Sequence, residues 1–414
     1  MPRLLCLFVF FVAIPVLAAD YPQFRGPAGD GHAQATGLPA TWNETTNVAW
    51  KTPIPGKGWS SPVLHQGRLY LTTAAPHDPD DEKRDLALWA FCLDAASGDV
   101  RWYREVFVQS VATAPKIHTK NSHASPTPLV SGERLFVHFG HRGTACLDLN
   151  GDVLWRNDRI EYNPVHGNGG SPILVDGRLI FTCDGASDPV VVALDAASGQ
   201  EAWRFGRPGE AAKKFSFCTP TAIETGGRTE VVCPGSGVVN SLDPASGQEI
   251  WRVYHDGYSV IPKPVFGHGL VFLSTGYDAP QVLAIRTGGR GDVTETQVAW
   301  TLKKGGPNTP SPLLVGDELY LISDKGIATC VDARTGRQHW QQRIGGNYSA
   351  SPVYADGKIY FQSEEGPAIV VKPGIKFVKL ADAGFKERTL ASYAVGENAL
   401  FIRTEKHLYR AEER

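Results

Sequence analysis

Short apolar runs separated by glycine-containing turns recur about every 40 to 50 residues along the chain. The first half of each unit is Ser-Pro or a close variant, then two apolar stretches around a tight turn, as in SPVLHQGRLYL from Ser61 to Leu71. The second half is an Asp-x-x-Ser/Thr-Gly turn and a strand that carries a Trp, as in CLDAASGDVRW from Cys92 to Trp102. Such runs predict short β-strands, and one unit cannot bury its own sheet faces. The period therefore predicts a β-propeller, with the units stacked as blades in a ring.

The number of units predicts the number of blades and the way the ring closes. Copies of the first half begin at Ser61, Thr127, Ser171, Thr219, Pro262, Ser311, Ser351 and Ser392. One Trp strand, Val48 to Trp50, precedes the first copy, whereas the copy from Ser392 has no Trp strand after it. Pairing the two ends completes an eighth blade and removes open sheet edges. We therefore predict an all-β fold: an eight-bladed β-propeller of four-stranded antiparallel blades, with the N-terminal strand closing the last blade.

The recurring residues have mainly structural explanations. Proline is tolerated on an edge strand, so Ser-Pro fits the innermost strand of a blade, which faces the central channel. Asp and Gly suit a hairpin turn, because Asp bonds nearby backbone N–H groups and Gly adopts positive φ. The Trp offers a large apolar surface that can wedge between blades. The function is therefore expected in the residues that do not repeat.

The region before the repeats divides into two segments. Residues 1–19 are typical of a signal peptide, with Arg3 before an apolar run and small residues at Ala18 and Ala19. A retained membrane anchor is the alternative, for which the apolar run is short, and Cys6 lies inside that run rather than in a lipobox. Residues 20–47, rich in Gly and Pro, are expected to cross the propeller surface as an irregular lead segment, and residues 48–414 form the propeller. We expect a periplasmic or secreted monomer, without an integral membrane segment once the signal is removed.

The net charge and the cysteine spacing bear on which ligands and cross-links the protein can have. The formal net charge is −2, so the basic excess of a nucleic-acid-binding protein is missing. Cys218 and Cys233 flank a hairpin, where a disulfide could form in an exported protein; buried free thiols are the alternative. The sequence contains no Cys-x-x-Cys-His haem motif and no Cys-x-x-Cys metal pair.

The Ala-x-Asp-x-x-Ser/Thr-Gly-x-x-x-Trp motif, as in ALDAASGQEAW from Ala193 to Trp203, resembles the tryptophan-docking repeat of pyrroloquinoline-quinone (PQQ) propellers. That superfamily includes the quinoprotein alcohol dehydrogenases and the outer-membrane assembly factor BamB. The resemblance covers nearly all of the chain after the signal segment. With YPQFRGPAGDG from Tyr21 and GGNYSASP from Gly345, it is similar to an exported bacterial subfamily without an established reaction.

The resemblance implies two functions from different classes. The dehydrogenases carry two adjacent cysteines, a calcium ion held by Glu and Asn, and an Asp base, and none of these maps onto a matching motif here. This departure favours an exported non-catalytic binding or scaffold propeller, with an unknown protein or small molecule as its partner. The alternative is a PQQ-dependent quinoprotein oxidoreductase that acts on alcohols or sugars at the central channel mouth. We assign no catalytic or metal-binding residue, and PQQ is the one cofactor that the resemblance offers.

The segments just before each Ser-Pro should converge on one mouth of the channel, where loops on a rigid scaffold usually carry function. They are rich in aromatic, His, Asn and Lys residues and poor in carboxylates, which suits an anionic or flat polar ligand such as a quinone carboxylate. The alternative is that these side chains satisfy strand ends and hold water. His123 and His166 lie on adjacent predicted blades, without the further ligand that would predict a metal site. The candidate ligand-binding residues are Trp59, Asn121, His123, His166, Asn168, Phe217, Tyr258, Lys263, Asn308 and Tyr348.

Overall fold

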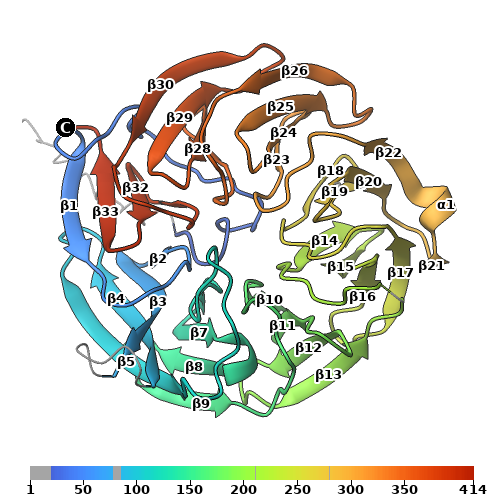
Figure 1. Ribbon diagram of the computed structural model, residues 1–414, viewed down its shortest axis with the longest axis horizontal. Helices are drawn as coiled ribbons and strands as arrows, with labels where there is room; N and C mark the ends of the chain where they lie inside the picture. Colours follow the sequence, from blue (N-terminus) through green and yellow to red (C-terminus); the bar gives the residue numbers. More distant parts are fainter. Residues whose placement is uncertain (1–19, 78–84, 210, 279) are drawn as a thin grey trace, which may run out of the picture.

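The computed structural model describes residues 20–77, 85–209, 211–278 and 280–414, which form eight sheets arranged in a ring (Figure 1). This confirms the predicted all-β, eight-bladed propeller. Residues 1–19, where the signal peptide is predicted, lie outside the described residues. Helices in the described ranges are all too short or too polar to cross a membrane.

The four main strands of each blade pair antiparallel, and in every blade but the last they run outward from the channel in chain order. The innermost strands are short, and all but β31 follow a proline, which cannot donate to a sheet ladder. They are β2 (Val63–His65), β6 (Leu129–Ser131), β10 (Ile173–Val175), β14 (Thr221–Thr225), β18 (Val265–Gly267), β23 (Leu313–Val315), β27 (Val353–Ala355) and β31 (Ala394–Val395). The second strands are β3 (Arg68–Pro76), β7 (Arg134–His138), β11 (Arg178–Cys183), β15 (Arg228–Gly235), β19 (Leu270–Ser274), β24 (Glu318–Ile322), β28 (Lys358–Gln362) and β32 (Ala399–Arg403).

The two outer positions of each blade carry the third strand and the Trp strand. The third strands are β4 (Leu86–Asp94), β8 (Thr144–Asp148), β12 (Val190–Asp195), β16 (Val238–Leu242), β20 (Val282–Arg286), β25 (Ile327–Asp332), β29 (Pro367–Lys372) and β33 (His407–Glu412). The outermost strands are β5 (Val100–Gln109), β9 (Val153–Asn157), β13 (Glu201–Gly206), β17 (Glu249–Tyr254), β22 (Val298–Leu302), β26 (Gln338–Arg343), β30 (Val378–Gly384) and β1 (Val48–Pro53). A 3-10 turn, η1 (Gly140–Arg142), lies between β7 and β8.

The ring closes as the strand count predicted. Strand β1 pairs antiparallel with β33, with Trp50 opposite Arg410, so the first strand completes the last blade. One blade departs from four strands: β21 (Gly291–Asp292) pairs in parallel with β17, and α1 (Thr294–Gln297) follows it. Both elements belong to the long insert between β20 and β22, so the insert extends the neighbouring blade outward.

The Trp and Gly residues that recur in the repeat meet across blade boundaries. Trp203 of β13 donates its indole N–H to the carbonyl of Pro244 in the next blade at 2.9 Å. The indole ring of Trp203 also packs on Gly247, in the turn that contains Pro244. A Cβ added at Gly247 would lie 2.6 Å from two indole carbons. Trp251 differs, because its indole bonds Glu230 of its own blade at 2.8 Å. The same cross-blade bond is made by Trp50, Trp102, Trp155, Trp300 and Trp340.

A ring of hydroxyl groups joins the innermost residues of the blades around the channel. In seven blades the residue at the Ser position of the Ser-Pro motif donates its backbone N–H to the hydroxyl at the same position of the next blade, at 2.9–3.1 Å. Lys263 takes this position in one blade, so it donates to Ser311 but offers no hydroxyl to Thr219. The other members are Ser61, Thr127, Ser171, Ser351 and Ser392.

The lead segment crosses the centre of the ring, where it is drawn in blue in Figure 1. It forms backbone hydrogen bonds with four blades, and the side chain of His32 bonds a fifth. The partners in the ring are Leu64, Val130, Leu314, Tyr354 and Glu397. Tyr21, Arg25 and Trp42 of this segment are fully or almost fully buried, so the segment is packed into the propeller rather than laid over solvent.

The six cysteines of the described chain are buried free thiols. The disulfide considered between Cys218 and Cys233 is therefore not formed, and the free-thiol alternative holds. The thiol of Cys218 points to the next blade, where it bonds the carbonyl of Pro262 at 3.1 Å. Cys233 lies on β15 opposite Asn240 of β16, so the two sulfur atoms face different neighbours.

Candidate functional site

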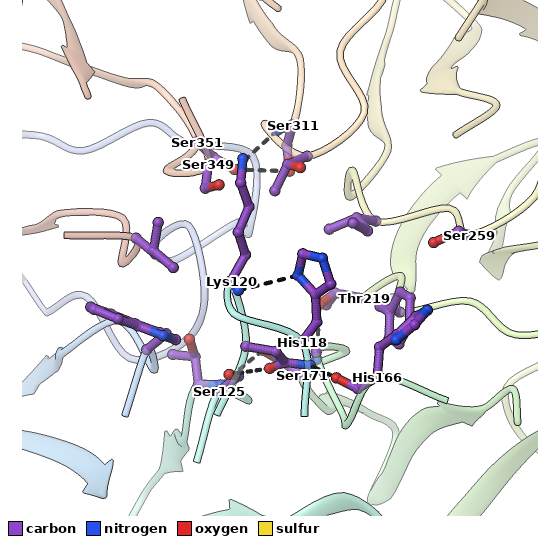
Figure 2. Close-up of a pocket in the computed structure, with 18 of the residues that line it drawn as sticks. His118, Lys120, Ser125, His166, Ser171, Thr219, Ser259, Ser311, Ser349 and Ser351 are labelled. Atoms are coloured by element: carbon purple, nitrogen blue, oxygen red, sulfur yellow. Dashed lines mark hydrogen bonds between the residues drawn. The ribbon is translucent and has the colours of Figure 1, made fainter. Parts of the chain in front are cut away.

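A cavity of about 310 Å³ lies at one mouth of the central channel. Every blade contributes to its lining through the residues at or before the inner proline, which is where the sequence placed the functional face. The hydroxyl ring lines it from seven blades, and Phe24 of the lead segment also lines it. Figure 2 shows the hydroxyls of Ser171, Thr219, Ser311 and Ser351 around the opening. A hydroxyl that accepts a backbone N–H still has its own O–H to donate, and Ser351 donates its O–H to Ser311 at 3.0 Å.

Aromatic side chains form one wall of the cavity. Phe215 is central: its ring lies 5.4 Å from that of His166 and 6.0 Å from that of Tyr258, both edge to face, and 5.9 Å from that of Phe217. Edge-to-face pairs at these separations are mutually stabilising. The wall therefore presents a preformed apolar surface against which a flat ring can stack.

Two lysines contribute charge in different ways. Lys120 extends across the cavity in Figure 2, and its ammonium meets the carboxylate of Glu364 from a distant blade at 2.6 Å. Ser349 also donates to Glu364, at 2.6 Å. The carboxylate of Glu364 thus neutralises the charge of Lys120, whose side chain crosses the mouth. Lys213 is solvent-exposed and donates to the hydroxyl of Tyr258 at 2.8 Å, a hydrogen bond that raises the pKa of Lys213. Lys213 is thus the cation that a ligand meets at the rim.

The histidine pair at the mouth is made by His118 and His166, whose rings lie 5.6 Å apart. Burial, followed by the proximity of His166 and Lys120, lowers the pKa of His118. His118 is therefore neutral at pH 7 and offers hydrogen bonds rather than charge.

Backbone strain gathers at the same place. His166 has φ of 66° and Ser259 has φ of 54°, and both line the cavity. Non-glycine residues in this left-handed region cost about 1–3 kcal/mol each and persist where the surroundings hold them. At Ser259 two hydrogen bonds hold the backbone N–H, to the hydroxyl of Ser236 at 3.1 Å and to the carbonyl of Phe215 at 3.2 Å.

Five of the ten candidate residues line this cavity: Trp59, Asn121, His166, Phe217 and Tyr258. The other five lie elsewhere, each for a local reason.

Tyr348 is 1% exposed and packs in the core between two blades. The side chain of Asn168 turns to Tyr162 and the carbonyl of Phe139. Asn308 bonds Asp324 through its backbone, and its side-chain oxygen is buried.

His123 lies near His141 rather than opposite His166, since its charge acts on the pKa of His141. Lys263 points away from the cavity toward Gly29 of the lead segment, where an added Cβ would lie 2.2 Å from its ammonium nitrogen.

Several lining residues have no place among those ten. His118, Lys120 and Lys213 belong to the same loops before the inner prolines. Phe215 alternates with Phe217 in KKFSF, and this period-two spacing is the signal that would have found it. Phe24 and Tyr277 come from the lead segment and from the turn after β19, where the repeat offers no guide.

A metal-bound quinone needs oxygen ligands for its metal ion. Among the described residues, the cavity lining includes no Asp or Glu, and no group of three or more His, Cys, Asp or Glu side chains is placed to hold a metal ion. Calcium prefers six to eight oxygen ligands, usually with carboxylates among them. The donor set therefore does not fit a calcium–quinone pair, although the aromatic wall and Lys213 suit a flat anion.

The fold and this channel mouth define a PQQ-like eight-bladed propeller. A protein-family model described as outer membrane protein assembly factor BamB matches residues 88–204, 161–342 and 235–373. These matches together cover more than half of the chain, so the chain belongs to that family. A curated relative, the outer membrane protein assembly factor BamB of Burkholderia pseudomallei (strain K96243), is 32% identical over 115 residues. The match spans 27% of this chain and 29% of that protein.

Solved structures share the fold at low sequence identity. BamB from Moraxella catarrhalis aligns over 88% of this chain and 99% of its own, with a TM-score of 0.59 and 13% identity. A europium-containing methanol dehydrogenase aligns over 94% and 90%, with a TM-score of 0.63 and 12% identity. The quinohemoprotein alcohol dehydrogenase ADHIIG from Pseudomonas putida HK5 aligns over 95% and 80%, with a TM-score of 0.62 and 11% identity. At these identities the likeness concerns the fold alone.

Proposed function

We propose that the protein is an exported, non-catalytic binding propeller that holds a flat polar ligand at the mouth of its central channel. The observation that carries the proposal is the lining of the cavity. An aromatic wall centred on Phe215 faces a ring of neutral hydroxyls, and the described lining contains no carboxylate. The volume, about 310 Å³, is at the lower end of the 300–1,000 Å³ typical of small-molecule sites.

The chemistry of the lining supports this ligand class. Phe215 and Tyr258 offer ring faces and edges for stacking. The ring hydroxyls and Asn121 offer hydrogen bonds to a polar edge, and Lys213 at the rim favours a negative group. General acid–base chemistry would need a titratable side chain with a pKa near the working pH. Burial lowers the pKa of His118, which favours its neutral form as a hydrogen-bonding group.

The ligand class is tested with 1-anilinonaphthalene-8-sulfonate, a flat anion that fluoresces in apolar surroundings. We expect one site, with binding weakened tenfold or more by Phe215→Ala and by Tyr258→Ala. Tyr103→Ala is the matched control, because Tyr103 is 58% exposed on β5 and does not line the cavity. Equal affinity in Phe215→Ala, Tyr258→Ala and the parent protein would contradict the proposed site.

The oxidoreductase alternative is tested separately. The protein is incubated with PQQ and CaCl₂, and dye-linked oxidation of ethanol and glucose is followed. We expect no turnover above the rate of the free cofactor. Sustained turnover that Lys213→Ala or Phe215→Ala abolishes would overturn the non-catalytic assignment.

A further inference from the structure

A buried cationic cluster lies where the lead segment meets the hydroxyl ring. Arg25 is 0% exposed and Lys263 is 3% exposed. Lys263 stands at the one ring position that lacks a hydroxyl, and its ammonium reaches Gly29, four residues after Arg25. Tyr21, also 0% exposed, completes the cluster.

The hydrogen bonding of this cluster is incomplete among the described residues. Arg25 donates through Nη2 to the carbonyl of Asp30 at 2.9 Å. Its Nε and Nη1 atoms are buried without a partner, as is the hydroxyl of Tyr21. A buried guanidinium normally has most of its donors bonded, because an unpaired buried donor costs about 1–3 kcal/mol and more when charged.

Two other buried arginines make more hydrogen bonds than Arg25, and Arg207 uses all three of its guanidinium nitrogens. Arg207 meets the carboxylate of Asp184 at 2.7 Å and donates to two backbone carbonyls. Arg403 has no carboxylate within 4.0 Å in the described chain, but its Nη1 donates to the carbonyl and hydroxyl of Ser60 and to a second carbonyl. Of these three arginines, Arg25 is the one with two guanidinium nitrogens that are fully buried and have no hydrogen-bond partner in the described chain.

The charges of the cluster do not balance. Arg25 and Lys263 carry two positive charges when protonated, and Asp30 is the carboxylate that acts on both. Burial, followed by repulsion from Arg25, lowers the pKa of Lys263 to about 7. Burial also lowers the pKa of Arg25, to about 10, so Arg25 stays charged at neutral pH. One negative charge is missing from the buried cluster at any pH at which both groups are protonated.

The backbone is strained at the same residue. Arg25 has φ of 67°, a left-handed conformation that costs about 1–3 kcal/mol for a non-glycine residue. Arg25 thus combines a strained backbone with a buried, incompletely bonded charge. A bound anion would offset the cost of burying that charge.

We propose that a small monovalent inorganic anion, of the size of chloride or bromide, binds between the guanidinium of Arg25 and the ammonium of Lys263. It accepts hydrogen bonds from the free N–H groups of Arg25 and from Lys263, and the unpaired, buried hydroxyl of Tyr21 is a further donor in the cluster. One such ion balances the charge. It also ties the lead segment to the blade that begins at Pro264, the blade in which the hydroxyl ring is interrupted. This site is separate from the proposed ligand site, because Lys263 does not line the cavity.

The location is tested with bromide in crystals of the whole protein. We expect an anomalous bromine peak within hydrogen-bonding reach of Arg25 and Lys263 in the parent protein, and no such peak in Lys263→Met. Lys213→Met is the matched control, because it removes a cation from the rim and leaves the buried cluster intact. The absence of a peak beside Arg25 in the parent protein, or a peak of equal height in Lys263→Met, would overturn the proposal.

The energetic test uses thermal unfolding in sodium bromide against sodium gluconate at equal ionic strength. An anion that binds only the folded state raises stability by RT ln(1 + [L]/Kd). A bromide concentration of 100 Kd should therefore raise the unfolding midpoint by about 2–4 °C in the parent protein and in Lys213→Met. Lys263→Met and Lys263→Ser should lose this dependence, and Lys263→Ser also restores a hydroxyl for the N–H of Thr219. Equal bromide dependence in all four proteins would overturn the proposal.

Discussion

The docking of Trp203 on Gly247 gives a quantitative test of how the blades are held together. Trp203 is 9% exposed and bonds Pro244 of the next blade at 2.9 Å. A Cβ at Gly247 would lie 2.6 Å from the indole ring, closer than non-bonded carbon atoms approach. Gly247→Ala should therefore displace the indole, whereas the same change should be tolerated where Trp203 has been removed.

The magnitudes follow from the geometry, with Gly177→Ala as the matched control. Gly177 has φ of 73° against 72° for Gly247, and an added Cβ at Gly177 meets nothing within 4 Å. Gly177→Ala should cost only the left-handed backbone, about 1–2 kcal/mol. Trp203→Ala should cost about 3–5 kcal/mol. Gly247→Ala should approach that value, because it adds the loss of indole packing to the backbone cost.

The assay is urea unfolding at 25 °C followed by far-UV circular dichroism, which does not depend on the removed fluorophore. In the Trp203→Ala background, Gly247→Ala should cost about as much as Gly177→Ala, which gives a coupling of about 2–3 kcal/mol in the double-mutant cycle. Additive effects of Trp203→Ala and Gly247→Ala would refute the docking argument. So would a Gly247→Ala variant that is no less stable than Gly177→Ala.

Two further predictions concern buried polar groups. Asp184→Asn should lower the free energy of unfolding by about 3–5 kcal/mol, because it leaves the guanidinium of Arg207 buried without the carboxylate that lies 2.7 Å away. Urea unfolding at pH 7 measures this loss, and a loss below about 1 kcal/mol would contradict the prediction. Burial lowers the pKa of His138 to about 3, so the unfolded chain takes up a proton at about pH 6.5 that the folded protein refuses. The stability that His138 contributes is therefore complete above pH 6.5 and is lost as the pH falls toward 3. From pH 6.5 to 5 this loss is about 2 kcal/mol, and His138→Phe should lose about 2 kcal/mol less than the parent over that interval; identical pH profiles would contradict it.

The architecture could be predicted because it depends on local patterns that repeat. The inner proline, the Asp-Gly turn and the Trp strand each have a short-range cause, and the unpaired strand at Val48 shows how the ring closes. The parallel pairing of β21 with β17 could not be predicted in this way. It involves two residue pairs, Trp251 with Gly291 and Arg252 with Asp292, and no periodic signal marks so short a strand.

The position of the candidate site was predictable, but its composition was only partly so. Chain topology brings the segments before the inner prolines to one mouth, whatever their side chains. The direction of each side chain within these irregular loops depends on contacts that are distant in sequence. Tyr348 turns into the core between two blades, and Lys120 reaches Glu364, 244 positions further along the chain. Phe24 reaches the cavity only because the lead segment crosses the ring.

The two proposed sites lie on different sides of the hydroxyl ring. At seven of the eight inner positions a neutral hydroxyl accepts a backbone N–H, so the scaffold is satisfied and O–H groups remain for a ligand at the mouth. Neutral donors select a ligand by the position of its acceptors rather than by its charge. At the eighth position Lys263 carries its charge away from the mouth, toward Gly29 and the buried Arg25. The same ring thus separates hydrogen-bonding recognition on the cavity side from charge on the lead-segment side, and Lys263→Ser is the substitution that removes the second while leaving the first in place.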